Sequence, residues 1–433
     1  MDNRKDIEIQ WVKEFLIPKL IENGSLKGKP TKDEFSIKEI SLKFIDSAEA
    51  FMLTNCFKIH LTYNCKNEAF SEDMVVKKTP KVSKEDYDAI NFKTLFGNEI
   101  LAYTKILPEL GSPTASLTLW DNYPKYYYSH LKDDEACIVL GDFVVDGWCM
   151  SKKQVDLSVE HLLLAAKHIG KFHGICYDLK HNNPEFFKSI IKLLGESRYA
   201  KEPPPEWDLI LRTAGQRSIN SARKYYGNMI PENFLKKLNQ DLSNIFEQGK
   251  ERLRPIEPEA ILCHGDYLRN NVAFQYKNTK DKDLPTAAMM FDFQTLRYSS
   301  PMCDLTTFIS LSSGKDTRQK NFERIFKSYC DSLKDTYESR TSNKIPDYLS
   351  YNSMLEEYVR YLPYSLGIAS SFLATLYEPH ALESTEEFLN QAKNEEQIIK
   401  DTTTRGGETV DKELAALVYE LYDFSQKLHV DIF

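Results

Sequence analysis

The sequence predicts an α+β protein of two lobes: a small β-rich N-terminal lobe and a large, mainly helical C-terminal lobe, with a cleft between them. Apolar and polar residues alternate in residues 35–44 and again in residues 57–63, which is the period of half-buried strands. Further along, Leu162, Ala166 and Ile169 recur at helical spacing and define one apolar face. This change of period places a sheet first and helices after it.

The boundary between the lobes is expected at a short apolar strand, residues 136–140, because it runs directly into Gly141 and Asp142 and helical spacing follows. The predicted organisation has three segments. These are an N-terminal lobe of residues 1–135, an interlobe hinge of residues 136–145 and a C-terminal lobe of residues 146–433.

Both ends of the chain are expected to contain helices. The charged N-terminus leads into an amphipathic stretch with Trp11 and Phe15, which favours a packed helix over a signal sequence. Residues 361–377 carry no charge, but they are at the short limit of membrane-spanning length, so we expect a buried helix. The polar residues 395–407 are predicted to form a loop before a terminal helix at residues 412–428.

Composition narrows the class of protein. A chain of 433 residues with 42% hydrophobic content is ample for two lobes. Its net charge of -8 argues against a nucleic-acid partner, since phosphate backbones select basic surfaces. Its eight cysteines include no C-x-x-C pair, which disfavours a zinc motif and a dense disulfide framework. We therefore expect a cytoplasmic protein without membrane insertion, as a monomer or a weak dimer.

The main functional signal is a loop that follows a short apolar strand and carries Asp266 and Asn271. Their spacing is that of a kinase catalytic loop, in which a carboxylate orients the attacking hydroxyl and an amide oxygen helps to hold magnesium. Turn-forming Asp and Asn residues also occur at such spacings by chance, so context decides. Here two more apolar strands follow, residues 272–276 and 287–293, and the second carries Asp292 as a further metal ligand.

Phosphoryl transfer also needs a Lys on an early strand and a helical Glu that holds it. A short apolar run at residues 74–76, with two β-branched valines, leads into Lys77 and Lys78, and Glu99 follows in a segment with helical periodicity. Strand alternation alone does not decide between the two lysines. A solvated charge is the ordinary interpretation of each residue, but their order ahead of the catalytic loop favours one site.

These segments resemble the insect ecdysteroid-kinase-like proteins, within the choline-kinase-like and aminoglycoside-phosphotransferase-like branch of the protein-kinase-like fold. The motifs that carry the resemblance are Val76-Lys77-Lys78-Thr79-Pro80, Phe96-x-x-Glu99-x-x-x-Tyr103, Cys137-Ile138-Val139-Leu140-Gly141-Asp142, Gly170-Lys171-Phe172-His173-Gly174, His264-Gly265-Asp266, and Phe291-Asp292-Phe293-Gln294 with Asp304-Leu305. The resemblance implies Lys77 as the phosphate-binding Lys and Glu99 as its partner. It also implies supporting roles for His264, which would brace the loop, and for Asp304, whose ordinary interpretation is a helix N-cap.

Neighbouring positions carry further expectations. His173 is expected to be a core residue bonded to the backbone, and Arg269 to be a solvated charge. Leu268 stands where many relatives carry Trp, and it is expected to alter the shape of the acceptor pocket. The phosphate-covering turn should fall near residues 46–54, which contain no Gly to ease close approach of the backbone.

We therefore expect a small-molecule kinase that uses ATP and Mg²⁺ to phosphorylate an alcohol, with Asp266 catalytic, Lys77 and Glu99 at the nucleotide, and Asn271 and Asp292 at the metal. The resemblance makes an ecdysteroid-like steroid or another lipophilic alcohol the leading acceptor. The alternatives are a nucleotide-binding pseudokinase, which the Gly-poor turn favours, and a choline- or amino-alcohol-type kinase. A phosphohydrolase is disfavoured because the nine His residues are dispersed, and a protein kinase because an Ala-Pro-Glu segment is missing.

Overall fold

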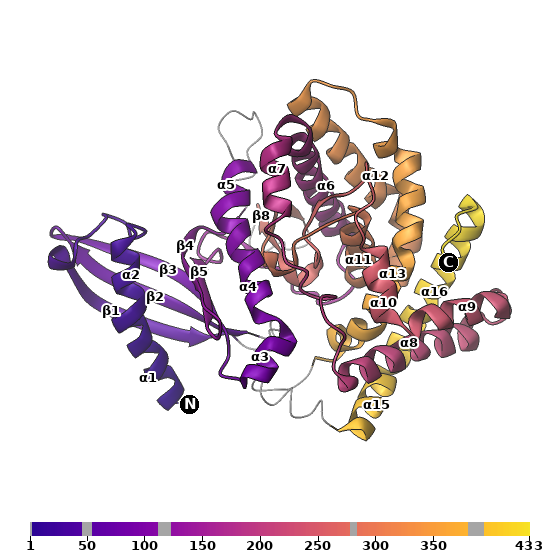
Figure 1. The fold of residues 1–433 in the computed structure, drawn as a ribbon, viewed down its shortest axis with the longest axis horizontal. Coiled ribbons are helices and arrows are strands. Elements are labelled where there is room, and N and C mark those ends of the chain that lie inside the picture. Colours follow the sequence, from indigo (N-terminus) through magenta and orange to yellow (C-terminus); the bar gives the residue numbers. More distant parts are fainter. Residues whose placement is uncertain (1, 46–53, 111–122, 278–283, 380–393) are drawn as a thin grey trace.

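A computed structural model of the protein separates into a β-rich part and a helical part (Figure 1). It describes residues 2–45, 54–110, 123–277, 284–379 and 394–433. The predicted α+β fold with a small β-rich lobe and a large helical lobe is confirmed. The predicted phosphate-covering turn lies outside the described residues, apart from Thr54.

A five-stranded antiparallel sheet of strand order β1-β2-β3-β5-β4 forms the N-terminal lobe. The strands are β1 (Phe35–Phe44), β2 (Asn55–Cys65), β3 (Glu68–Lys78), β4 (Tyr126–Leu131) and β5 (Ala136–Gly141). Alternate residues of β2, namely Phe57, Ile59 and Leu61, are buried in a core of this lobe, as their period predicts. Residues 136–141 of the expected hinge therefore belong to the sheet, and the chain leaves it at Asp142.

Helices and helical turns complete the N-terminal part of the chain. They are α1 (Asp2–Trp11), a π-helical turn (Val12–Leu16), α2 (Ile17–Glu22), α3 (Lys84–Ile90), α4 (Phe92–Leu101), a second π-helical turn (Ala102–Ile106) and α5 (Leu107–Leu110). Of these, α1, α2 and α4 contact the sheet. Val12, Leu16 and Leu20 share the core of β2, which confirms the packed N-terminal helix. Helix α4 lies between the sheet and the helices of the larger lobe (Figure 1).

The C-terminal lobe is built mainly from helices. They are α6 (Val159–Asn182), α7 (Pro184–Ile191), α8 (Pro205–Tyr226), α9 (Glu232–Leu242), α10 (Ile245–Arg252), α11 (Met302–Ser312), α12 (Lys315–Thr341), α13 (Tyr351–Tyr377), α15 (Glu395–Thr404) and α16 (Gly407–Leu428). Helices α6 and α12 approach closely, because a Cβ at Gly170 would lie 2.5 Å from the Tyr329 carbonyl oxygen and one at Gly174 would lie 2.8 Å from that of Leu333. Gly170 and Gly174 thus allow α6 and α12 to pack closely.

The predicted loop at residues 395–407 is wrong, because most of it forms helix α15. The Asn394 side chain accepts a hydrogen bond from the backbone N–H of Gln397 and caps this helix. Only Ile398 of α15 is buried, so the helix has little apolar periodicity to reveal it. The uncharged residues 361–377 lie in α13, as expected of a buried helix. No helix in the described ranges has the length and apolar character needed to cross a membrane.

Two small sheets present the catalytic loop. Strand β7 (Ile261–Cys263) pairs with β10 (Arg297–Ser299), and β6 (Cys149–Met150), β8 (Val272–Tyr276) and β9 (Pro285–Met290) form the second sheet. The loop runs from the end of β7 to the start of β8. Val272 at the start of β8 pairs with Met290 at the end of β9. Asn271 and the segment with Asp292 therefore lie at the same end of this strand pair.

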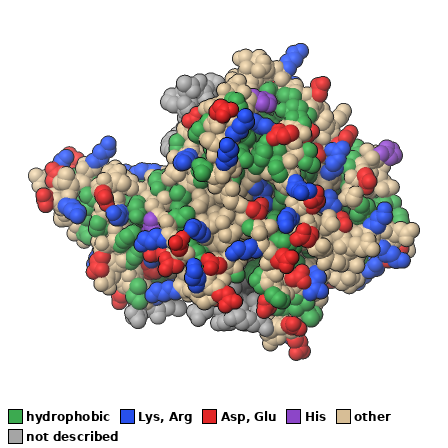
Figure 2. All heavy atoms as spheres, viewed as in Figure 1, with side chains coloured by type: hydrophobic (Ala, Val, Ile, Leu, Met, Phe, Trp, Pro, Cys, Tyr) green, Lys and Arg blue, Asp and Glu red, His purple; other side chains and the backbone are tan. Residues whose placement is uncertain are grey.

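Charged side chains of both signs are interspersed over the face shown in Figure 2. A nucleic-acid surface would be expected to gather its Lys and Arg residues on one face or along one helix. That face carries no such single-sign patch.

Candidate active site

The ammonium group of Lys77 on β3 lies between two carboxylates. Its Nζ is 2.8 Å from Oε2 of Glu99 on α4 and 2.7 Å from Oδ1 of Asp292. The neighbouring Lys78 points to the other face of the sheet and pairs with Glu8 at 2.8 Å. Strand alternation left open whether Lys77 or Lys78 faces the site. Their partners show that it is Lys77, which faces the segment that carries Asp292.

Burial and charge act against each other in this cluster. Burial by itself lowers the pKa of Lys77, but the carboxylates of Asp292 and Glu99 outweigh it and raise that pKa above its ordinary value. Burial raises the pKa of Glu99 to about 7, although the Lys77 ammonium opposes the rise. One cation thus serves two carboxylates, so the cluster has room for additional positive charge.

Asp266 and Asn271 are bonded to each other within the catalytic loop. The Asn271 amide nitrogen donates to the Asp266 carbonyl oxygen at 2.8 Å and to its carboxylate Oδ2 at 3.1 Å. Both bonds use the nitrogen, and no described residue donates to the amide oxygen. The backbone N–H of Phe291 donates to the Asn271 carbonyl at 3.1 Å, which joins the loop to the segment that carries Asp292.

The oxygen atoms of Asn271 and Asp292 suit magnesium, which prefers carboxylate and other hard oxygen ligands. Asp292 has φ 66° and ψ 67°, a left-handed conformation that is uncommon for a residue other than Gly. His264 Nε2 donates to the carbonyl of the preceding Phe291 at 3.0 Å. Residues in uncommon backbone conformations, such as Asp292, cluster at functional sites, where the surrounding structure holds them in place.

Asp304 on α11 anchors the start of the catalytic loop. Its Oδ2 accepts the backbone N–H of His264 and its Oδ1 accepts that of Gly265, both at 2.7 Å. Its Oδ2 also lies 3.1 Å from His173 Nε2. Burial would raise the pKa of Asp304, but the His173 contact and the Gly265 N–H help to lower it. These bonds lie inside the first turn of α11, and Asp304 is not its N-cap.

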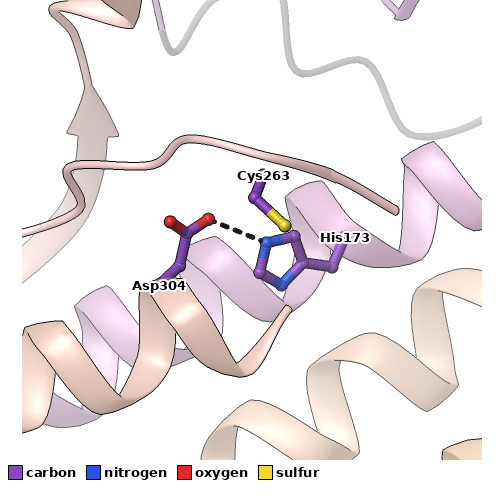
Figure 3. A group of neighbouring side chains, drawn as sticks. All are labelled: His173, Cys263 and Asp304. Carbon is purple, nitrogen blue, oxygen red and sulfur yellow. Dashed lines mark hydrogen bonds and ion pairs between the residues drawn. The ribbon is translucent and has the colours of Figure 1, made fainter. Parts of the chain in front are cut away.

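His173, Asp304 and Cys263 form a buried group whose members lie close enough to be considered as metal ligands (Figure 3). Their hydrogen bonds indicate a structural role instead, because they join the start of the catalytic loop to neighbouring segments. The Cys263 thiol lies within 3.3 Å and 3.4 Å of the carbonyls of Ser299 and Ser300, and burial raises its pKa well above the ordinary value. His173 is a core residue as predicted, but its partners are side chains, which corrects the expected backbone bond.

One prediction for the loop needs correction. Arg269 is not a solvated charge: it is 6% exposed, and its guanidinium donates to the backbone carbonyls of Lys153, at 2.9 Å, and Ser151. Leu268 is buried in the main hydrophobic core, and its effect on the acceptor pocket stays a prediction. The hydrogen bonds of Arg269 and the packing of Leu268 therefore attach the loop to the rest of the C-terminal lobe.

Arg198 was missed by the sequence-based reasoning. It lies in the irregular segment between α7 and α8, and its Nη2 is 3.0 Å from Oδ1 of Asp266. Its Nη1 is 3.5 Å from the Tyr364 hydroxyl on α13. A single Arg in a segment without periodicity gives no sequence signal, and only the folded chain brings it to Asp266.

Comparison with solved structures finds chains of low sequence identity. An ethanolamine kinase of Plasmodium vivax is 12% identical, with 82% of each chain covered and a TM-score of 0.37. The GDP and kanamycin complex of APH(2")-IIia is 12% identical, with 88% of this chain and 99% of that chain covered and a TM-score of 0.34. The aminoglycoside phosphotransferase APH(3'')-Id of Streptomyces rimosus, in complex with ADP and streptomycin, is 10% identical, with 65% and 87% covered and a TM-score of 0.28.

Comparison with curated proteins gives no match. A family model, by contrast, matches residues 48–341, which include Lys77, Glu99, Asp266, Asn271 and Asp292. That range is more than half of the chain, and it confirms the resemblance found in the motifs. The chain belongs to the ecdysteroid kinase-like family.

Proposed function

We propose that the protein is an ATP- and magnesium-dependent kinase that phosphorylates a small-molecule alcohol. The observation that carries the proposal is the combination of two bonded groups. Lys77 is paired with Glu99 and Asp292, and Asp266 is bonded to Asn271 at the same edge of the β8–β9 sheet. Phosphoryl transfer needs this set: a cation for the phosphates, oxygen ligands for the metal and a carboxylate for the attacking hydroxyl.

Each side chain has a distinct part in the proposed reaction. Lys77, held by Glu99, neutralises the phosphates of the nucleotide, and the oxygens of Asn271 and Asp292 hold magnesium. When bound, magnesium would screen charge on the phosphates. Asp266 orients the acceptor hydroxyl and takes its proton as the acceptor oxygen bonds to the γ-phosphorus. The bond from the γ-phosphorus to the bridging oxygen breaks, and ADP leaves.

We extend the proposal to an ecdysteroid-like steroid or another lipophilic alcohol as the acceptor. Membership of the ecdysteroid kinase-like family supports this. The buried aromatic rings of Tyr361 and Tyr364 also support it, because Tyr364 lies beside the Arg198 side chain that contacts Asp266. A choline- or amino-alcohol-type kinase is the alternative within the same chemistry.

A cytoplasmic setting is part of the proposal. None of the eight cysteines, all of which lie in the described ranges, forms a disulfide. That pattern is usual for proteins of reducing compartments.

The test is a mass-spectrometric screen of the purified protein with MgATP and a panel of sterols, amino alcohols and xenobiotic alcohols. The expected result is a phosphorylated alcohol and release of ADP. Asp266→Ala should lower turnover by about 10²–10⁴-fold, the contribution of a positioned general base, while MgATP still binds. Asp208→Asn, which changes an exposed carboxylate on α8, is the matched control.

The outcomes separate the candidate functions. Normal turnover by Asp266→Ala would remove Asp266 from the chemistry. ATP binding without phosphoryl transfer to any alcohol would favour the pseudokinase, for which the Gly-poor segment near residues 46–54 is the specific observation. Steady phosphate release without a phosphorylated alcohol would favour a phosphohydrolase.

A further inference from the structure

Arg198 is the one described cation, besides Lys77, that pairs with a carboxylate of the proposed catalytic set. Its Nη2 is 3.0 Å from Oδ1 of Asp266, while Asn271 uses the other carboxylate oxygen, Oδ2. The Arg198 and Asp266 side chains are 29% and 23% exposed, so the pair is partly open to an incoming molecule. The guanidinium therefore sits where an acceptor hydroxyl has to arrive.

The backbone around Arg198 is held by the C-terminal lobe. The Glu196 carboxylate accepts the backbone N–H groups of Arg198 at 2.8 Å and Tyr199 at 3.0 Å. Its other oxygen pairs at 3.3 Å with Arg297, which is almost fully buried. These bonds hold the bend in the chain at residues 197–200 that carries the Arg198 side chain.

The same segment is also held by the N-terminal lobe. The Asn98 side chain on α4 donates to the Gly195 carbonyl at 2.8 Å and accepts the Gly195 N–H at 3.0 Å. Asn98 directly precedes Glu99, the partner of Lys77. The backbone that carries Arg198 is thus anchored on two sides, and its guanidinium contacts Asp266 and Tyr364. Such preorganisation is what makes a fixed charge effective in a transition state.

The charge balance at Asp266 changes during the proposed transfer. Before the reaction, Asp266 is the anionic partner of Arg198. When Asp266 takes the proton of the acceptor hydroxyl, its carboxylate becomes neutral and the Arg198 charge loses that partner. Negative charge is then on the phosphoryl group next to the same carboxylate. An interaction that strengthens only at this point accelerates the reaction rather than tightening substrate binding.

We propose that Arg198 is a second cation of the phosphotransfer site, which pairs with Asp266 in the unloaded protein and with the transferring phosphoryl group in the transition state. This inference rests on the proposed kinase function. A guanidinium suits the role because its fork of donors can contact a carboxylate and a phosphoryl oxygen together. A lysine ammonium at this position keeps the charge but lacks the fork.

The experiment compares Arg198→Gln and Arg198→Lys with the wild type. The control is Arg212→Gln, which removes an Arg from an exposed pair with Asp208 on α8. Steady-state kinetics should show that Arg198→Gln lowers kcat by about 10²–10³-fold, the usual loss for one preorganised donor, with little change in KM for ATP. Arg198→Lys should recover part of this loss, and the control should match the wild type.

A second measurement does not depend on the identity of the acceptor. Calorimetry gives the Kd of MgADP alone and of MgADP with aluminium fluoride, which mimics the transferring phosphoryl group. Fluoride should tighten binding to the wild type, and Arg198→Gln should lose most of that tightening while its Kd for MgADP alone is kept. A merely structural role would change both Kd values together and leave their ratio as in the wild type.

Several results would overturn the inference. Arg198→Gln with wild-type kcat and wild-type tightening by fluoride would show that Arg198 takes no part. A faster Arg198→Gln variant would show that the pair with Asp266 blocks the site instead. In both cases a wild type that phosphorylates an alcohol leaves the proposed function standing. If the wild type phosphorylates no alcohol, the proposed function fails and this inference fails with it.

Discussion

Gly265, which directly precedes Asp266, is a position where a single methyl group should displace the catalytic loop. Its backbone has φ +82°, a region that residues with a Cβ rarely adopt. A Cβ at this position would lie 1.9 Å from the Thr295 carbonyl oxygen and 2.8 Å from Arg297 Nε. Contacts of real Cβ atoms essentially never fall below 3.0 Å, so Gly265→Ala requires the loop to shift by about 1 Å.

The size of the effect follows from two contributions. A left-handed backbone costs a residue with a Cβ about 1–2 kcal/mol. Overpacking against a backbone carbonyl lowers the free energy of unfolding by a further amount of about 1–3 kcal/mol. The displacement also reaches Asp266, and a shift of about 1 Å in a catalytic group can lower turnover by about 10²-fold.

Gly24→Ala is the control that separates the two contributions. Gly24 has φ +68°, but no atom lies within 4 Å of the position its Cβ would occupy. Urea unfolding should show a loss of about 1–2 kcal/mol for Gly24→Ala and a larger loss for Gly265→Ala. Only Gly265→Ala should lower kcat. Equal stability and equal turnover of the two variants would refute the steric reasoning.

Two more predictions concern buried carboxylates. The pKa of Glu99 is about 7 in the folded protein against 4.5 for the free group, so its contribution to stability is present below pH 4.5 and is lost as the pH rises to 7. Glu99→Gln lacks this pH dependence. Urea unfolding should show that the free energy of unfolding of the wild type falls by about 1–3 kcal/mol relative to that of the variant between about pH 5 and pH 8. A difference that does not change with pH would contradict the raised pKa. Asp304→Asn replaces one of two oxygens that accept backbone N–H groups with an NH₂ group, and it should cost about 2–4 kcal/mol and lower kcat. A loss as small as that of the exposed Asp208→Asn would argue against the anchoring role of Asp304.

Local patterns in the sequence were sufficient for much of the fold. The period-2 alternation in β2 and the helical stripe in α6 are properties of neighbouring residues, and burial of one face enforces them. The polar helix α15 shows the limit of this reasoning. It buries only Ile398, so no apolar face is present in the sequence to distinguish it from a loop.

The candidate site divides in the same way. Asp266 and Asn271 precede β8, and Asp292 follows β9, which pairs with β8, so their spacing in the sequence was enough to group them. Lys77 and Glu99 were grouped by their order along the chain, and the family resemblance favoured Lys77 over Lys78. Strand alternation alone left that choice open, because the partners of the two lysines depend on which face of β3 meets α4 and Asp292. That face is set by packing between the lobes.

The sequence by itself indicated the α+β fold and the acidic and amide residues of the loop, because these depend on short-range period and spacing, and its motifs indicated the family. Only the tertiary structure showed that Lys77 contacts Asp292, that Arg269 is buried and that Arg198 meets Asp266. Arg198 lies 68 positions before Asp266, and no local pattern connects them. Contacts over such distances in sequence arise only when helices and strands pack, which is why the pair of Arg198 with Asp266 came from the structure.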